Sequence, residues 1–256
     1  MAEALVVFAA VLLVPLGLAL IGAPRWIRLA QLPAALCLAA SFAFPKGPAA
    51  AGLAAPWALV TLAVAFHGIA RLAARRTFEA GELGVDAACG FLLVGGAWAL
   101  LSRAGVTAGY PSIIGLLTAV HFHYAGFVLP ILAVLAHRRL RTRTSPLPVW
   151  GVIAGMPLIA VGITFSPLVE WLAAWMLALT SIVLAVNQVR LARPLLVVSG
   201  LSLLVGMSLA GVYALAHFLG RSWIGIPEMI PTHGILNGVG FCLCGLLGWG
   251  PVMRDA

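Results

Sequence analysis

Charged residues are scarce in this chain: only 9% of its 256 residues are Asp, Glu, Lys or Arg, whereas 63% are hydrophobic. A soluble domain carries about 25% charged residues. A soluble fold of this length could not keep so much apolar sequence away from water. The scarcity of charge therefore excludes a soluble globular protein and indicates an integral membrane protein.

Short alternating segments, which are typical of membrane β-barrel strands, are also lacking. The apolar runs instead have the length of helices that cross a bilayer. The sequence therefore predicts an all-α fold, a polytopic transmembrane bundle of about nine helices, with eight as the alternative count. Residues 1–256 are expected to form a single integral-membrane domain with a retained first helix. The expected helices are 4–22, 27–45, 52–71, 82–102, 112–137, 147–166, 169–189, 194–219 and 232–250.

Cysteine is rare as well, and its four copies form no pattern that indicates a disulfide framework or a zinc site. They are Cys37, Cys89, Cys242 and Cys244, and all lie within apolar runs. The sequence also lacks the CxxCH and HExxH motifs. We expect buried, unreactive thiols, no metal and no cofactor.

The basic residues are distributed unevenly along the chain, although its net charge is +8. With the N-terminus outside, 12 of the 15 Lys and Arg residues fall in inner segments. This bias predicts that the N-terminus is outside and the C-terminus inside, and it explains the charge without nucleic acid. The tryptophans are expected in aromatic belts: Trp26, Trp150 and Trp249 near the inner interface, and Trp57, Trp98, Trp171, Trp175 and Trp223 near the outer one.

This topology gathers most of the polar side chains in the outer half of the membrane. Ionisable groups are costly in lipid and usually face the bundle interior or a watery cavity. We therefore expect one polar pocket near the outer leaflet. Its residues come from helices 112–137, 169–189, 194–219 and 232–250 and the loop before the last: His121, His123, Tyr124, Glu170, Tyr213, His217, Glu228, Thr232, His233 and Asn237.

Helical geometry refines the expected pocket wall. His233 and Asn237 are four residues apart and share a face, with Thr232 as an expected N-cap. His121 and Tyr124 also share a face, whereas His123, two residues from His121, does not. One of the two histidines is therefore expected to face the pocket. Pro130 is expected to kink the helix below this point.

Histidine titrates near neutrality and is retuned by its surroundings, so these residues suit acid–base chemistry. The leading hypothesis is an isomerase or cyclase that acts on a lipophilic small molecule entering from the outer leaflet. Glu228 is the expected acid, and His121 or His123 the base. His233 is the remaining catalytic candidate, and Asn237 would position the substrate with it. Further substrate contacts are assigned to Tyr124, Thr232, Glu170 and His217.

Two other functions remain open. One is a haem or metal site, in which His121 or His123 would pair with His233 or His217, or a zinc site that adds Glu228. The other is a proton-coupled transporter, although the ionisable groups gather at one depth. At the inner side, Glu79, Glu82 and Asp86 form an acidic face after several arginines. This face predicts a salt-bridge network, with a second site or a proton path as the alternative.

The stretches "HFHYAGF" at 121–127 and "THGILNGVGF" at 232–241 resemble the YndJ-like family of bacterial multi-pass membrane proteins. The resemblance implies that the two segments belong together and that the protein lies in the bacterial cytoplasmic membrane. It does not supply a reaction. The expected partners are the lipid bilayer and a lipophilic substrate. Longer members of the family carry additional sequence that is absent here.

Overall fold

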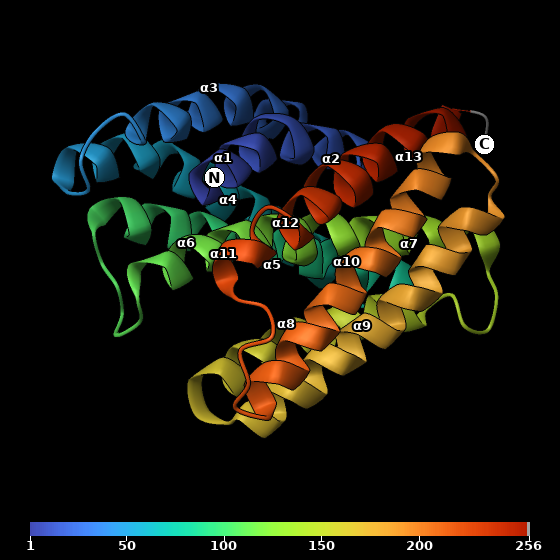
Figure 1. The fold of residues 1–256 in the computed structure, drawn as a ribbon. Coiled ribbons are helices and arrows are strands. Elements are labelled where there is room, and N and C mark those ends of the chain that lie inside the picture. Colours follow the sequence, from blue (N-terminus) through green and yellow to red (C-terminus); the bar gives the residue numbers. More distant parts are fainter. Residues whose placement is uncertain (255–256) are drawn as a thin grey trace. The chain divides into compact units, whose positions relative to one another are not determined.

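The computed structural model describes residues 1–254, and these form nine long helical segments without any strand (Figure 1). The all-α fold predicted from hydropathy is confirmed. The expected helix bounds lie within four residues of the observed ones when the last helix is taken from His233 to Arg254. The contacts divide the chain into two compact units, Met1–Ile131 and a second that begins at Leu132. Each unit is described by itself, and the single functional domain stays a prediction.

The first unit contains four complete helical segments and most of a fifth. Two of the segments include a π-helix, denoted η, in which each hydrogen bond spans five residues instead of four. The elements are α1 (Ala2–Phe8), η1 (Ala9–Leu13), α2 (Val14–Leu20), α3 (Arg25–Ser41), α4 (Pro48–Arg75), α5 (Ala80–Ala104), α6 (Ser112–His121), η2 (Phe122–Val128) and the start of α7 (Leu129–Leu140).

The second unit contains the rest of α7 and four further helical segments. Its elements are α8 (Leu147–Phe165), α9 (Pro167–Arg190), α10 (Pro194–Phe218), α11 (Ile226–Met229), α12 (His233–Ile235), η3 (Leu236–Leu243) and α13 (Cys244–Arg254). Helices α9 and α10 begin on Pro167 and Pro194, where the missing N–H costs no helical hydrogen bond. Figure 1 shows α8, α9 and α10 running side by side.

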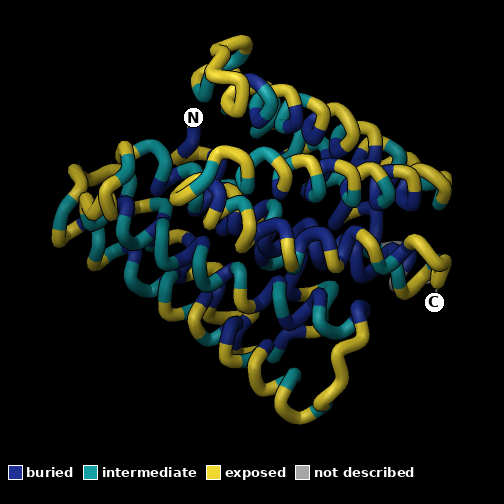
Figure 2. The backbone as a smooth tube through the Cα atoms, turned by 90° about the horizontal axis from the view of Figure 1, so that it is seen from below, coloured by how far each residue is buried: buried dark blue, intermediate teal, exposed yellow. Residues whose placement is uncertain are grey.

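Eight helices in the described part of the chain are long and apolar enough to cross a membrane. The remaining long helix, α3, has 17 residues. Buried and exposed residues alternate along individual helices (Figure 2). Exposed leucines and phenylalanines such as Leu59 and Phe66 on α4 are costly in water but suit a helix that faces lipid. The protein is therefore a multi-pass membrane protein.

Glycines allow the helices within each unit to approach closely. In the first unit, a Cβ atom added to Gly96 of α5 would fall 2.1 Å from Oγ1 of Thr61 on α4. In the second unit, a Cβ atom on Gly162 of α8 would fall 2.2 Å from the backbone nitrogen of Glu170 on α9. Membrane helices pack through such small residues because lipid gives apolar side chains little reason to prefer protein. These contacts place the polar side chains described next.

Candidate functional site

His123 lies in η2 and is completely buried in the first unit. Its Nδ1 lies 2.7 Å from the carbonyl oxygen of Ala119, and its Nε2 lies 3.1 Å from Nε1 of Trp57. A carbonyl only accepts and an indole N–H only donates, so the imidazole is the neutral tautomer with its proton on Nδ1. Gly95 of α5 makes room for this ring. His123 therefore joins η2 to α4, and both of its nitrogens are engaged.

Trp57 was expected in the outer aromatic belt, but this prediction is wrong. Its side chain is fully buried, and its ring lies nearly parallel to that of His123, with 5.6 Å between centroids. A buried indole needs an acceptor for its N–H, and Nε2 of His123 provides it. The sequence indicates only that a buried tryptophan N–H needs an acceptor, and it does not identify His123 as that acceptor.

His121 and Tyr124 differ in their surroundings, although α-helical spacing places them on one face. His121 is exposed, and its Nδ1 donates to the carbonyl oxygen of Leu117 at 2.8 Å. Tyr124 is buried, and its hydroxyl donates to the carbonyl oxygen of Leu5 at 2.9 Å. The reason for the difference is that Tyr124 lies within η2, where the hydrogen-bond spacing departs from the α-helix. Of the two motif histidines, His121 is the exposed one.

His233 and Asn237 lie in the second unit, and both contact α10 at Gly206. Nδ1 of His233 donates to the Gly206 carbonyl oxygen at 2.8 Å. The Asn237 amide donates to the His233 carbonyl oxygen at 2.8 Å, and a Cβ atom at Gly206 would fall 2.6 Å from this amide. The predicted common face of His233 and Asn237 is therefore packed against α10.

Glu228 and Thr232 are used in local hydrogen bonds before α12. Oε2 of Glu228 accepts from the backbone N–H of Gly225 at 2.9 Å, which closes the first turn of α11. Thr232 occupies the expected N-cap position of α12, but its hydroxyl donates back to the carbonyl oxygen of Glu228 at 2.6 Å instead of capping that helix. Both residues are exposed.

Glu170 and His217 form a carboxylate–imidazole pair between α9 and α10. Nδ1 of His217 donates to Oε2 of Glu170 at 3.1 Å. Glu170 lies in the first turn of α9 and His217 in the last turn of α10. The helix dipoles favour a negative charge at the first position and a positive charge at the second. The Glu170 side chain is 13% exposed and the His217 side chain 55% exposed, so the imidazole is the accessible member.

Aromatic rings surround this pair on α9 and α10. Trp171 stacks on Phe218 with 5.0 Å between ring centroids and 15° between planes. The ring of Tyr213, one turn before His217, lies 6.4 Å from the imidazole. Trp175 packs against Gly211 on α10. The pair therefore lies beside aromatic side chains of α9 and α10.

The arginines and acids at the junction of α4 and α5 form the predicted salt-bridge network. Arg71 lies 2.8 Å from Glu82 and 3.1 Å from Asp86. Arg75 lies 3.3 Å from Glu82 and also pairs with Asp86. The Asp86 side chain is buried, so the two guanidinium groups compensate its charge. This arrangement confirms the predicted network for Glu82 and Asp86, whereas Glu79 is exposed.

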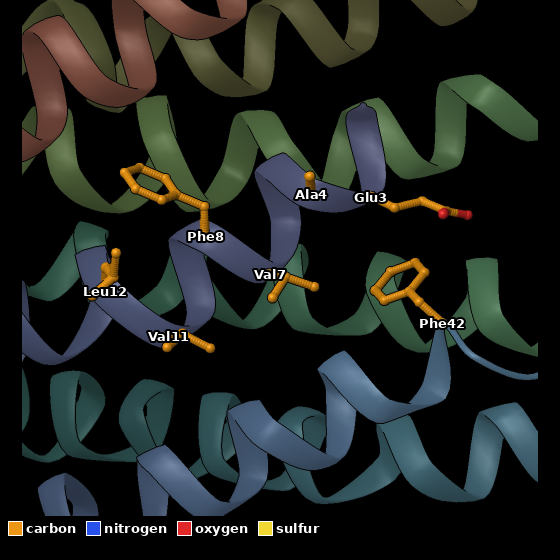
Figure 3. A pocket seen from close by; sticks show the side chains of 7 residues that line it. All are labelled: Glu3, Ala4, Val7, Phe8, Val11, Leu12 and Phe42. Atoms are coloured by element: carbon orange, nitrogen blue, oxygen red, sulfur yellow. The ribbon is translucent and has the colours of Figure 1, made fainter.

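An apolar groove of about 470 Å³ runs along α1 and η1 in the first unit. Figure 3 shows the Val7 side chain and the Phe42 ring facing each other across it. The guanidinium carbon of Arg103 lies 4.7 Å from the centre of the Phe42 ring, and this buried side chain donates to the carbonyl oxygens of Ser41 and Phe44 at the end of α3. Arg103 therefore stabilises a helix C-terminus. The groove contains none of the predicted site residues.

No group of three or more His, Cys, Asp or Glu side chains that could hold a metal ion occurs within residues 1–254. His123 has both nitrogens hydrogen-bonded and is not available as an axial haem ligand in this arrangement. His121, His123 and Tyr124 belong to the first unit and the other predicted site residues to the second. The single shared pocket stays a prediction, whereas Glu170 and His217 meet within one unit.

Known proteins similar to this chain give a family but no activity. The family model described as YndJ-like protein matches residues 4–241. The uncharacterized membrane protein YndJ of Bacillus subtilis (strain 168) is 29% identical over 208 residues, which cover 77% of this chain and 38% of that protein. The chain thus matches well under half the length of that relative. No solved structure matches. Since the family model matches nearly the whole chain, this multi-pass membrane protein belongs to the YndJ-like family.

Proposed function

We propose that the chain is the membrane-embedded part of an acid–base enzyme, of the isomerase or cyclase type, that acts on a lipophilic small molecule in the bacterial cytoplasmic membrane. The observation that carries this proposal is the Glu170–His217 pair. Its carboxylate fixes the imidazole orientation, and the imidazole is accessible. A general acid or base positioned in this way contributes about 10²–10⁴-fold to a rate.

The chemistry follows from the geometry of the pair. Because Nδ1–H of His217 donates to Glu170, Nε2 is the nitrogen that takes up or releases a proton. A proton delivered to one carbon of an alkene and removed from another moves the double bond without net consumption of protons. The stacked Trp171 and Phe218 rings offer apolar contact beside the pair. This chemistry requires acid–base groups and an apolar surface, and both are present at the ends of α9 and α10.

The catalytic roles differ from those predicted from the sequence. Glu228 accepts a hydrogen bond that closes a helix turn, and His123 has both nitrogens engaged. We therefore assign the proton transfer to His217, oriented by Glu170. His121 and His233 stay as predicted contributors to the site.

Deuterium incorporation tests the proposal without knowledge of the substrate. Cells that produce the protein in D₂O should contain a lipophilic product that carries one more deuterium on carbon than the same compound from cells without the protein. Mass spectrometry of lipid extracts detects this difference. His217→Gln and Glu170→Gln should lower its formation about 100-fold or more, because they remove or misorient the proton carrier. His67→Gln, on α4, is the matched control and should retain the product. Equal labelling in cells with and without the protein, or full labelling with His217→Gln, would contradict the proposal.

A further inference from the structure

Five positions of α10 follow one face of the helix over a length close to the thickness of a membrane, and each carries a polar side chain or, at Gly206, a backbone carbonyl that accepts a hydrogen bond. They are Ser199, Ser202, Gly206, Tyr213 and His217. Their spacings of three, four, seven and four residues return to the same side of an α-helix. The 18 residue steps from Ser199 to His217 rise about 27 Å, close to the roughly 30 Å of a hydrocarbon core. The polar positions therefore form a file along the helix instead of a cluster at one depth.

The lower part of this file is buried between α9, α10 and η3. The Ser199 hydroxyl lies 2.8 Å from the carbonyl oxygen of Phe241 and 3.0 Å from Oε1 of Gln188. Gln188 is completely buried, and its amide nitrogen has no hydrogen-bond partner in the described protein. An amide donor buried without an acceptor costs about 1–3 kcal/mol. This donor therefore indicates that a water molecule or another acceptor completes the file at this depth.

The middle of the file continues along η3. A Cβ atom on Gly240 would fall 2.2 Å from Oγ of Ser202, so this hydroxyl lies against the η3 backbone. One turn further along α10, the Gly206 carbonyl accepts from His233. Hydroxyl and imidazole groups both donate and accept hydrogen bonds, as a chain of proton transfers requires. The motif "THGILNGVGF" thus supplies the wall that faces these positions.

The upper part leads to the carboxylate–imidazole pair. Tyr213 lies two turns beyond Gly206 on the same face of α10. Its ring contacts His217, which donates to Glu170 at the end of the helix. The file therefore ends at the exposed imidazole of His217.

We propose that this file is a proton path through the second unit, between Glu170–His217 at one end and Ser199–Gln188 at the other. Intramembrane polar residues that face a bundle interior commonly form proton relays. The ligands are protons and the water molecules that bridge them, and the net movement is one proton down its electrochemical gradient. The same contacts could serve only to join helices, with a value of about 0.6–2 kcal/mol each. Proton flux distinguishes the two roles, because helix joining moves no charge.

The test uses the purified full chain in liposomes that enclose a pH-sensitive dye. A potassium gradient with valinomycin drives protons inward, and the potassium ions compensate their charge. The wild-type protein should acidify the lumen faster than protein-free liposomes. The double variant Tyr213→Phe with Ser202→Ala removes two hydroxyl groups of the file and should reduce flux to the protein-free rate. Ser208→Ala is the matched control, since Ser208 is exposed on another face of α10 and its hydroxyl bonds the Leu204 carbonyl of the same helix.

Two results would overturn the proton path. One is a wild-type flux equal to that of protein-free liposomes, which is decisive even if the variants fail to fold. The other is an undiminished flux in the double variant after size-exclusion chromatography has shown that it is folded. The experiment contains no lipophilic substrate, so its result does not depend on the proposed enzyme activity. Deuterium labelling of a product in the absence of proton flux would support the proposed enzyme activity and contradict the proton path.

Discussion

Hydrogen bonds to both nitrogens of His123 give this residue a structural role in the first unit. Trp57 and Ala119 hold the ring in one tautomer at a fully buried position. A protonated ring would present a second N–H to the indole N–H, and neither group could accept. The residue therefore favours one arrangement of α4 against η2. His121, two residues earlier, is exposed instead of buried.

Replacement of Trp57 by Phe should destabilise the protein by about 1–3 kcal/mol. The ring remains aromatic, but the buried Nε2 of His123 loses its donor, and an unsatisfied buried acceptor carries this cost. The free energy of unfolding of the purified protein, measured by SDS titration in mixed micelles, checks this value. Trp26→Phe is the control, because Trp26 is 60% exposed and should change stability by less than about 0.5 kcal/mol. Equal effects of the two changes would refute the structural role of the hydrogen bond.

Depth was predictable at the residue scale, but side-chain partners were not. Hydropathy and loop charge place Glu170 and His217 at the same end of neighbouring helices, and the structure joins them. Trp57 and His123 are 66 residues apart, and no periodicity indicates which faces of their helices meet. The common depth of Glu170 and His217 is therefore predictable from the sequence, whereas the contact between Trp57 and His123 is visible only in the packed structure.

Proline explains two of the three π-helices at the element scale. η1 ends at Leu13 and η2 at Val128, and in each case a proline follows two residues later, at Pro15 and Pro130. A proline ring clashes with the carbonyl group four residues before it, which here lies inside the π-helix. The wider π-turn relieves this clash. The kink expected at Pro130 thus corresponds to a π-helix just before it in a helix that continues to Leu140.

Buried side chains provide donors to the backbone carbonyls of these irregular segments. The Gln31 amide donates to the Ala10 carbonyl oxygen of η1 at 2.5 Å, and Ser199 bonds the Phe241 carbonyl oxygen of η3. In lipid, a backbone group freed from the helix must find a partner inside the protein. Hydropathy predicts the length of a helix but carries no signal for its internal hydrogen-bond spacing. The three π-helices were therefore absent from the sequence-based prediction.

Two glycines of α5 provide a test of helix contact within one element. Gly96→Ala would place a Cβ atom 2.1 Å from Oγ1 of Thr61, and overpacking of this kind costs about 1–3 kcal/mol. Gly90 lies in the same helix with nothing within 4 Å of an added Cβ atom, so Gly90→Ala should be neutral or slightly stabilising. SDS titration of both variants measures the difference. Similar unfolding free energies would show that α4 and α5 are not in this close contact.

At the scale of the whole molecule, the number of membrane crossings depends on α3. Its 17 residues rise about 26 Å, against roughly 30 Å for the hydrocarbon core, whereas eight other helices in the described chain are long enough. If α3 crosses, nine crossings place the termini on opposite sides. If it lies along the membrane, eight crossings place them on the same side. The loop charges favour nine, because this count puts 12 of the 15 basic residues on one side.

Cysteine accessibility distinguishes the two topologies in intact cells. In a background with the four native cysteines replaced by alanine, Arg25→Cys and Lys46→Cys place an exposed thiol at either end of α3. With nine crossings and the N-terminus outside, a membrane-impermeant maleimide should label position 46 in intact cells and position 25 only after permeabilisation. Arg143→Cys, in the basic loop before α8, is also exposed and should behave like position 25. Labelling of positions 25 and 46 from the same side would show that α3 does not cross, and labelling of position 143 in intact cells would show that the basic loops lie outside.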